Sequence, residues 1–222
     1  MAVEQKHFEE ELKEFKEKLL TMGSHAERSV SKALRALTER DENLALQVQA
    51  DDDIIDRLEI DLDEYAIHLL TKAPLASDLR LVTVAAKLSQ NLERIGDEAT
   101  TIARRAIDLA HEPPLDARVD IAGMAKIALQ MLKDALDCFV KKDPAAARAL
   151  IPRDKEVDAI NRSIHGQLSN IIVENPASIS RCLNLMTVSK SLERVADHAK
   201  NIAEEVVYFC EARDIRHEGR VG

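Results

Sequence analysis

The amino-acid sequence predicts an all-α protein built from two tandem, pseudo-repeated three-helix bundles, with six long antiparallel helices in total. Three observations support this prediction. The 222 residues are 32% charged and only 3% aromatic, with six Gly and six Pro, a composition that favours long helices. Proline and capping residues interrupt the chain at five places, and apolar residues recur with helical spacing between them. Finally, the two halves of the sequence align with each other.

The first half contains three of the predicted helices. The first ends at Arg40, and Asp41 can cap the second helix, which runs to Ala73 and Pro74. Ser77 or Asp78 can cap the third helix in the same way, and that helix runs to His111. Each predicted helix has about 30 residues, which corresponds to about 45 Å at a rise of 1.5 Å per residue.

The second half repeats this plan. The diproline Pro113-Pro114 is the strongest break and predicts a boundary between a first bundle at 1–111 and a second bundle at 116–215. Asp143 followed by Pro144 predicts the start of the second helix of this half, because proline is favoured at the first helical position. Asn175 and Pro176 then precede its last helix.

One helical segment occurs twice and identifies an internal duplication. "LERIGDEATTIARRA" (92–106) and "LERVADHAKNIAEEV" (192–206) align at an offset of 100 residues. Upstream the offset is 102, so that Asp52-x-x-x-Asp56 matches Asp154-x-x-x-Asp158 and Pro74 matches Pro176. Each third helix therefore has Glu-x-x-x-Asp, and each second helix has Asp-x-x-x-Asp.

The orientation of these carboxylates follows from the apolar stripe of each helix. The stripe of the third helix contains Leu88, Leu92, Ile95, Ala99, Ile102 and Ala106, and in the second half Val188, Leu192, Val195, Ala199, Ile202 and Val206. Glu93 falls about 140° and Asp97 about 180° from its centre, and Glu193 and Asp197 behave identically. Asp52 and Asp56 flank the stripe of the second helix. The pairs lie equally far from the turn between the helices, so each half is expected to present four acidic side chains in one outward patch.

These patches predict metal binding. Acidic side chains at i and i+4 repel each other, and clustered carboxylate oxygens suit hard or borderline cations such as Mg²⁺, Mn²⁺ or iron. The alternative is that the acids only solvate an exposed face and that Arg94 and Arg194 neutralise them. The candidate metal ligands are Asp52, Asp56, Glu93, Asp97, Asp154, Asp158, Glu193 and Asp197.

Several function classes are disfavoured. A net charge of -9 argues against nucleic-acid binding, and no apolar run is long enough to span a membrane, so we expect a cytoplasmic protein that reaches a membrane only through a partner. No phosphate-binding loop or catalytic motif is present, which predicts no catalytic or cofactor-binding residues. Cys138, Cys182 and Cys210 are expected to be apolar core residues, and His198 to be exposed to solvent.

The doubled Leu-Glu-Arg-x-x-Asp helix, the paired Asp-x-x-x-Asp segments and "PLASDLR" (74–80) resemble the PhoU family of bacterial phosphate-specific transport over the whole chain. The resemblance implies two similar three-helix bundles, multinuclear metal clusters on the eight acids, and a homodimer. Ala196 stands where the first half has Gly96, and "PASISRCLN" is a weak echo of the "PLASDLR" segment, which makes the second site the less certain.

The resemblance also implies a function. PhoU-like proteins couple the ATPase of the phosphate ABC transporter to a sensor histidine kinase and hold the phosphate-starvation response off when phosphate is plentiful. Two other interpretations remain open from the residues alone. One is a carboxylate protein that sequesters metal without a signalling role, and the other is a helical scaffold whose acids keep it in solution.

Overall fold

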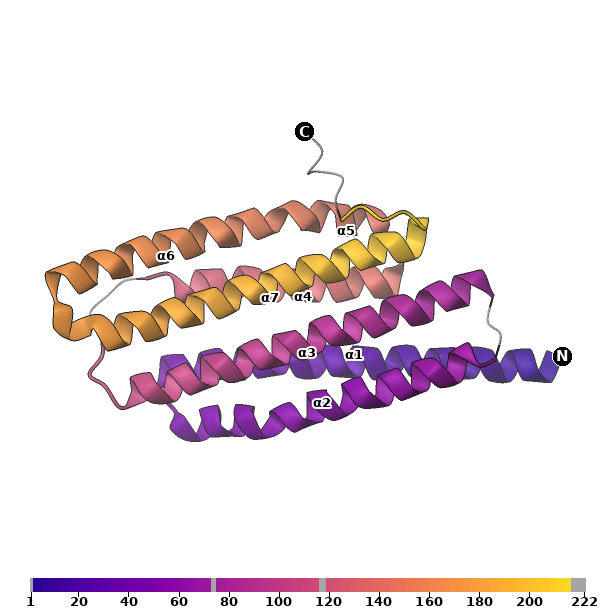
Figure 1. Cartoon of the computed structure of the whole chain (residues 1–222), viewed down its shortest axis with the longest axis horizontal. Helices are drawn as coiled ribbons and strands as arrows, with labels where there is room; N and C mark the ends of the chain where they lie inside the picture. The colour runs from indigo at the N-terminus through magenta and orange to yellow at the C-terminus, as the bar shows by residue number, and fades with distance from the viewer. Residues whose placement is uncertain (1, 73–74, 116–118, 217–222) are drawn as a thin grey trace.

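The computed structural model describes residues 2–72, 75–115 and 119–216, with side chains from residue 6 onward. Within these ranges all the regular secondary structure is helical, as the sequence predicts (Figure 1). The predicted turn at Ala73 and Pro74 and the position Asp116 lie outside the described residues. None of the described helices is long and apolar enough to cross a membrane.

Three long helices form the first bundle: α1 (Ala2–Glu39), α2 (Glu42–Leu70) and α3 (Ala76–Ala110). The carboxylate of Asp41 caps α2 by accepting a hydrogen bond from the backbone N–H of Leu44 at 3.0 Å, as expected. The expected cap of α3 is wrong, because α3 begins after Leu75 without a side-chain cap. Because the helix already begins at Ala76, Ser77 and Asp78 lie in its first turn instead of before it.

The second bundle contains α4 (Ile121–Lys141), α5 (Pro144–Leu150), α6 (Asp154–Glu174) and α7 (Ile179–Glu211). The cap of α5 is as predicted, because Asp143 accepts from the backbone N–H of Ala146 at 3.0 Å. The sequence predicts one helix from here to residue 174, but the 3₁₀ turn η1 (Ile151–Arg153) divides it. Pro152 explains the division, since proline removes a backbone donor and its ring clashes with the preceding turn. A second 3₁₀ turn, η2 (Pro176–Ser178), precedes α7.

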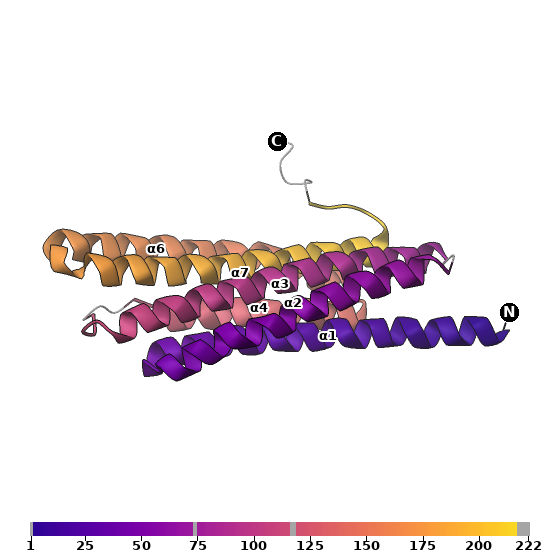
Figure 2. The same ribbon diagram turned by 60° about the horizontal axis from the view of Figure 1, so that its bottom comes forward.

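The two bundles lie side by side, with α3 and α7 in contact along their length at the centre and α1 beside α4 (Figures 1 and 2). Polar contacts show that α3 and α7 are antiparallel: Lys87 binds Glu205 at 3.0 Å, and Arg105 binds Asn184 at 3.2 Å. A pseudo-twofold axis therefore passes between the middles of α3 and α7, where residues 94–98 face residues 194–198.

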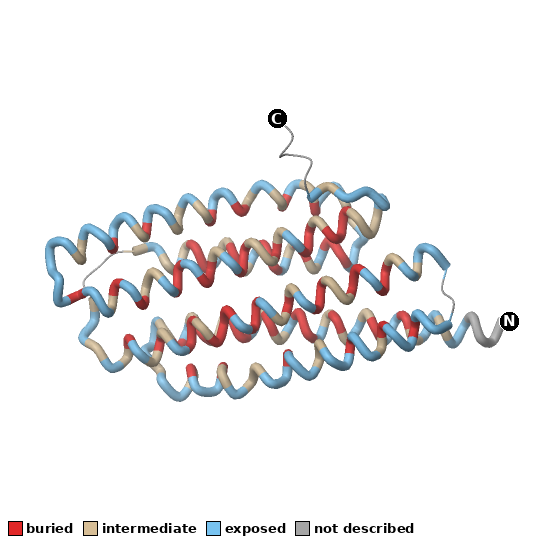
Figure 3. Tube along the Cα trace, in the orientation of Figure 1, coloured by how far each residue is buried: buried red, intermediate tan, exposed pale blue. Residues whose placement is uncertain are grey.

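The core is one continuous cluster that runs through both bundles (Figure 3). All twelve apolar-stripe positions predicted on α3 and α7 are buried. Both helices also bury residues outside the stripe: on α3, Gly96 packs against α2 of the same bundle, whereas Glu98 is buried against α7 of the opposite bundle. Cys138 and Cys182 are buried and Cys210 is half-buried, as expected of core cysteines, and all three are free thiols.

The boundaries of the two bundles, 1–111 and 116–215, remain predictions. In the structure α3 ends at Ala110 and α4 begins at Ile121.

Candidate functional site

The first acidic patch consists of Asp52 and Asp56 on α2 and Glu93 and Asp97 on α3. Packing brings the two helices close together at Gly96, where a Cβ atom would lie 3.0 Å from Ile55 Cδ1 and 3.1 Å from Asp52 Oδ1. The glycine of the repeated motif thus lets the carboxylate of Asp52 approach the backbone of α3. The four predicted acids of the first half therefore do lie at one level of the bundle.

These four side chains differ in exposure. Asp56 and Asp97 are exposed, as the outward direction predicts, whereas Asp52 is half-buried. Only 17% of the Glu93 side chain is exposed, against 49% for Asp97. Glu93 is less exposed than its 140° position on an isolated helix implies, because α2 packs along that side of α3.

Burial and mutual repulsion raise the pKa values in the first patch. Burial, with the charges of Asp56 and Asp97, raises the pKa of Asp52 to about 6, although Thr100 and Arg104 partly oppose the shift. Burial, with the charges of Asp97, Glu59 and Asp56, raises the pKa of Glu93 to about 7. The carboxylates are thus close enough to disfavour each other's charge.

Two neighbours complete the first patch. Glu59 lies one turn beyond Asp56 on α2, and burial and the surrounding acids raise its pKa too. Arg94 contacts Glu93 at 3.3 Å and Asp97 at 3.0 Å, but its side chain is 63% exposed, so solvent screens this compensation. Its positive charge is smaller than the negative charge of the patch.

The second acidic patch consists of Asp154 and Asp158 on α6 and Glu193 and Asp197 on α7. Burial, followed by the charge of Glu193, raises the pKa of Asp197, while Lys200 opposes the shift. The predicted acids of the second half are therefore also brought together, but two lysines are placed among them. Lys200 forms an ion pair with Asp154, and Lys190 forms one with Glu193.

The burial of Asp154 corrects the expectation that this residue sits on the outer side of the core. It is 7% exposed and lies under the Lys200 side chain. Sequence reasoning overlooked Lys190, Lys200 and Glu59. Helical spacing could have identified them, since each lies three residues from a predicted ligand and so on the same face of its helix.

The acids fit a hard cation in donor type, since all eight carry carboxylate oxygens. Their side chains do not converge in a coordination geometry: over residues 2–72, 75–115 and 119–216, no three His, Cys, Asp or Glu are arranged to hold one ion. Coordination would therefore require the exposed members, such as Asp56 and Asp97, to change rotamer.

A polar hollow of about 560 Å³ lies between the two patches, at the pseudo-twofold axis. It is lined by Arg94, Asp97, Glu98, Arg194, Asp197, His198 and Asn201. His198 is half-buried and its Nδ1 lies 3.0 Å from Asn91 Oδ1, so the expectation of a solvent-exposed histidine is wrong. The α3–α7 contact covers it, and burial lowers its pKa. Glu98, its counterpart, is buried and accepts a hydrogen bond from Arg194 at 3.0 Å.

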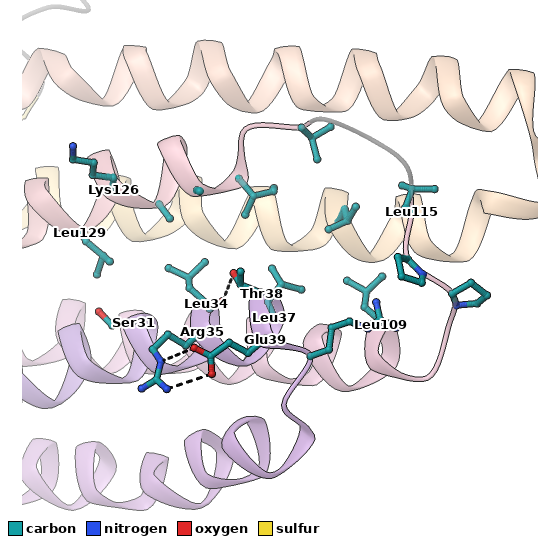
Figure 4. Close-up of a pocket in the computed structure, with 18 residues that line it drawn as sticks. Ser31, Leu34, Arg35, Leu37, Thr38, Glu39, Leu109, Leu115, Lys126 and Leu129 are labelled. Atoms are coloured by element: carbon teal, nitrogen blue, oxygen red, sulfur yellow. Dashed lines mark hydrogen bonds and ion pairs between the residues drawn. The ribbon is translucent and has the colours of Figure 1, made fainter.

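A larger cavity, of about 830 Å³, lies away from both patches (Figure 4). Its walls come from the end of α1, the segment after α3 and the start of α4, and they are mainly apolar, as at Leu34, Leu37 and Leu129. Arg35 and Glu39 form an ion pair at its edge. This cavity holds none of the eight predicted acids.

Comparisons with known proteins agree on one family. A PhoU domain is matched twice, at residues 19–106 and 121–206. The chain is 40% identical over 214 residues to a phosphate-specific transport system accessory protein PhoU homolog of Pseudomonas putida, covering 96% of this chain and 84% of that protein. It is 33% identical to the phosphate-specific transport system accessory protein PhoU of Escherichia coli, over 96% of this chain and 88% of that one.

A solved structure has the same fold over nearly the whole chain. The crystal structure of PhoU from Pseudomonas aeruginosa superposes with a TM-score of 0.90 at 38% identity, covering 93% of this chain and all of that one. PhoU accessory proteins are regulatory proteins and not enzymes, in agreement with the sequence prediction. The two matched domains, the full-length relatives and the shared fold together place this chain in the PhoU family.

Proposed function

We propose that this chain is a cytoplasmic regulator of phosphate-specific transport that represses the phosphate-starvation response when phosphate is plentiful. The observation that supports this best is the end-to-end match to accessory proteins of that transport system. The proposed partners are the ATPase of the phosphate ABC transporter and a sensor histidine kinase, which the protein couples to each other. Its rigid paired bundles with charged outer faces are suited to binding two proteins at once.

Deleting the gene in its own host tests this function. We expect a phosphate-starvation reporter to be switched on in phosphate-rich medium and to be repressed again when the intact gene is restored. The matched control is the same deletion in a strain without the sensor kinase, where the reporter should stay off. Normal repression in the deletion strain would contradict the proposal.

We also propose that the eight predicted acids bind metal, with the first patch binding more strongly than the second. The support is the excess negative charge around Asp52 and Glu93, whose pKa values are raised by burial and by neighbouring acids. A bound cation would supply the positive charge that the first patch lacks. In the second patch, Lys190 and Lys200 already supply part of it.

Metal content measured by plasma mass spectrometry tests this proposal on protein purified without chelator or a metal-affinity tag. We expect the wild type to contain iron, manganese or magnesium, and Glu93→Gln/Asp97→Asn to lose most of it. The matched variant Glu193→Gln/Asp197→Asn should lose less. A metal-free wild type, with variants that are equally folded, would favour the solvated-face interpretation.

We propose that the protein is a homodimer, and two exposed isoleucines on α2 are candidates for the contact. Ile60 is 58% and Ile67 is 64% exposed, and a spacing of seven residues puts them on one side of the helix. Light scattering coupled to size-exclusion chromatography should give twice the mass of the chain. Ile60→Glu/Ile67→Glu is expected to give the monomer, and a monomeric wild type would contradict the proposal.

A further inference from the structure

A small basic pocket lies between α3, α6 and α7, beside the second acidic patch. Its volume is about 320 Å³, and its polar wall is formed by Thr101 of α3, His165 of α6 and Thr187, Lys190, Ser191 and Arg194 of α7. None of the described residues that line it is acidic. The pocket therefore combines two permanent positive charges with three hydroxyl groups and an imidazole, and this set of groups suits a negatively charged ligand.

The two cations of the pocket keep hydrogen-bonding capacity beyond their present ion pairs. Arg194 donates one hydrogen bond to Glu98, at 3.0 Å, but a guanidinium has five N–H donors. Lys190 is paired with Glu193, and an ammonium has three donors. The side chains are 57% and 48% exposed, so both heads can move toward a ligand without unfolding the bundle.

His165 provides the buried polar atom of the pocket. Its Nε2 is buried and has no hydrogen-bond partner, although buried polar atoms are normally paired. The Nε2 of a histidine can donate a hydrogen bond when it carries the ring proton. A rotation of the His165 ring, which lines the pocket, would bring this donor to an anionic ligand.

The first half of the chain lacks this set of residues. At the alignment offsets of 102 and 100, Asp63 stands in place of His165 and Gln90 in place of Lys190. Only the arginine, Arg94, is retained. The duplication therefore brings an acid to the equivalent position in the first half, and the basic pocket belongs to the second half alone.

We propose that this pocket binds a small oxyanion, held by charge-assisted hydrogen bonds from Lys190 and Arg194 and by the imidazole of His165. Bidentate arginine contacts and ammonium groups are the usual ligands of phosphate and sulfate oxygens. Because Lys190 also pairs with Glu193, a bound anion competes with that carboxylate for the ammonium. The pocket is thereby linked to the second acidic patch, but anion binding itself does not depend on metal.

Calorimetric titration of the metal-free full chain with inorganic phosphate tests the proposal, with sulfate and glycerol 3-phosphate as parallel ligands. We expect saturable binding to the wild type and a loss of about tenfold or more in affinity in Lys190→Gln and in Arg194→Gln, tenfold being 1.4 kcal/mol. Arg94→Gln is the matched control at the equivalent position of the first half and should change affinity less than twofold. Thermal melting confirms that each variant is folded.

The three ligands distinguish the source of the oxyanion. Binding of phosphate and sulfate supports a free inorganic anion, and binding of glycerol 3-phosphate alone supports an organic phosphate, provided that Lys190→Gln weakens it. The absence of saturable binding for all three ligands would overturn the proposal. Binding that Arg94→Gln weakens as much as Arg194→Gln would overturn it too, because it would place the anion elsewhere.

Discussion

The two acidic patches have the same ancestry and the same acids but different charge balances. In the first patch, Asp52 and Glu93 are half-buried and their pKa values are raised, while the opposing cation Arg94 is largely exposed. In the second patch, Asp154 is almost fully buried, yet Lys200 pairs with it directly. The first patch thus has less charge compensation from the protein itself than the second.

Four replaced positions contribute to this difference. Compared with the first half, Glu59 becomes Asn161, Asp63 becomes His165, Gln90 becomes Lys190 and Thr100 becomes Lys200. Each of these four replacements makes the second half more positive or less negative, whereas the replacement of Arg104 by Glu204 acts in the opposite direction. The halves as a whole differ in the same direction: residues 1–111 hold 15 basic and 23 acidic residues, and residues 112–222 hold 16 and 17.

The difference shows that duplicated motifs can keep their spacing while their neighbours change the chemistry. The Glu-x-x-x-Asp motif is identical in both halves, so the motif alone predicts two equal metal sites. The residues one turn away decide whether a patch is compensated by the protein itself, because charges on one helix face interact across three or four positions.

The largest expected effect comes from removing the internal cation of the second patch. Lys200→Thr should lower the free energy of unfolding by about 2 to 3 kcal/mol at pH 7, because it leaves the buried carboxylate of Asp154 unpaired. Urea denaturation measures this change. Lys155→Thr, which removes an exposed lysine from α6, should have almost no effect. If the two variants are equally stable, the second patch does not depend on its lysine.

A pH titration of stability should distinguish the first patch. A carboxyl whose pKa is raised in the folded state binds more protons there than in the unfolded state, so its contribution to stability is lost as pH rises. For Asp52 and Glu93 the loss falls between about pH 4 and pH 7. As the pH rises over this range, the free energy of unfolding of the metal-free wild type should fall by about 2 kcal/mol more than that of Asp52→Asn/Glu93→Gln. This figure is discounted for the screening of the two carboxyls by solvent. Urea denaturation at a series of pH values measures this. An equal dependence of the unfolding free energy on pH in the wild type and the variant would contradict the prediction.

Introducing a lysine into the first patch should make it resemble the second. Thr100→Lys places an ammonium at the position of Lys200. We expect it to lower the metal content of the protein and to change the stability of the metal-free form by less than about 1 kcal/mol, because the cost of overpacking this buried position offsets the gain from charge pairing. Denaturation and plasma mass spectrometry measure the two effects. Thr83→Lys, on an exposed position of α3, is the control. An unchanged metal content in Thr100→Lys would show that charge compensation does not control binding.

The smallest effect is expected at Gly96, one of the two residues that differ between the two motifs. In Gly96→Ala the new Cβ would lie 3.0 Å from Ile55 Cδ1, so the end of the Ile55 side chain must move by a few tenths of an ångström. The better helix propensity of alanine, about 1 kcal/mol, offsets that cost. We expect a net change below about 1 kcal/mol in thermal denaturation. A loss of several kcal/mol would show that the close approach of Asp52 to α3 is essential to the bundle.

Several features of the fold were predictable because they depend on local sequence. The caps at Asp41 and Asp143 follow from residue type at a helix start, and they were confirmed. The break at Pro152 could also have been predicted from the same rules. The apolar stripes of α3 and α7 are buried because a period of 3.6 residues leaves one face for the core.

Other features depended on contacts between distant segments. The pairing of α3 with α7 buries Glu98 and covers His198, which helical periodicity alone places outside the core stripe. The same pairing creates the hollow between the patches and the basic pocket around Lys190. The sequence pattern of either half does not predict which face of its bundle contacts the other bundle.

The sequence by itself determined the helices, the duplication and the positions of the eight acids, because each depends on spacing along one helix. The tertiary structure decided how far each acid is buried, which lysine pairs with which carboxylate, and where the cavities lie. Burial and charge pairing are properties of neighbours in space, and in this chain the decisive neighbours come from different helices. The identical motifs therefore became two patches of unequal charge.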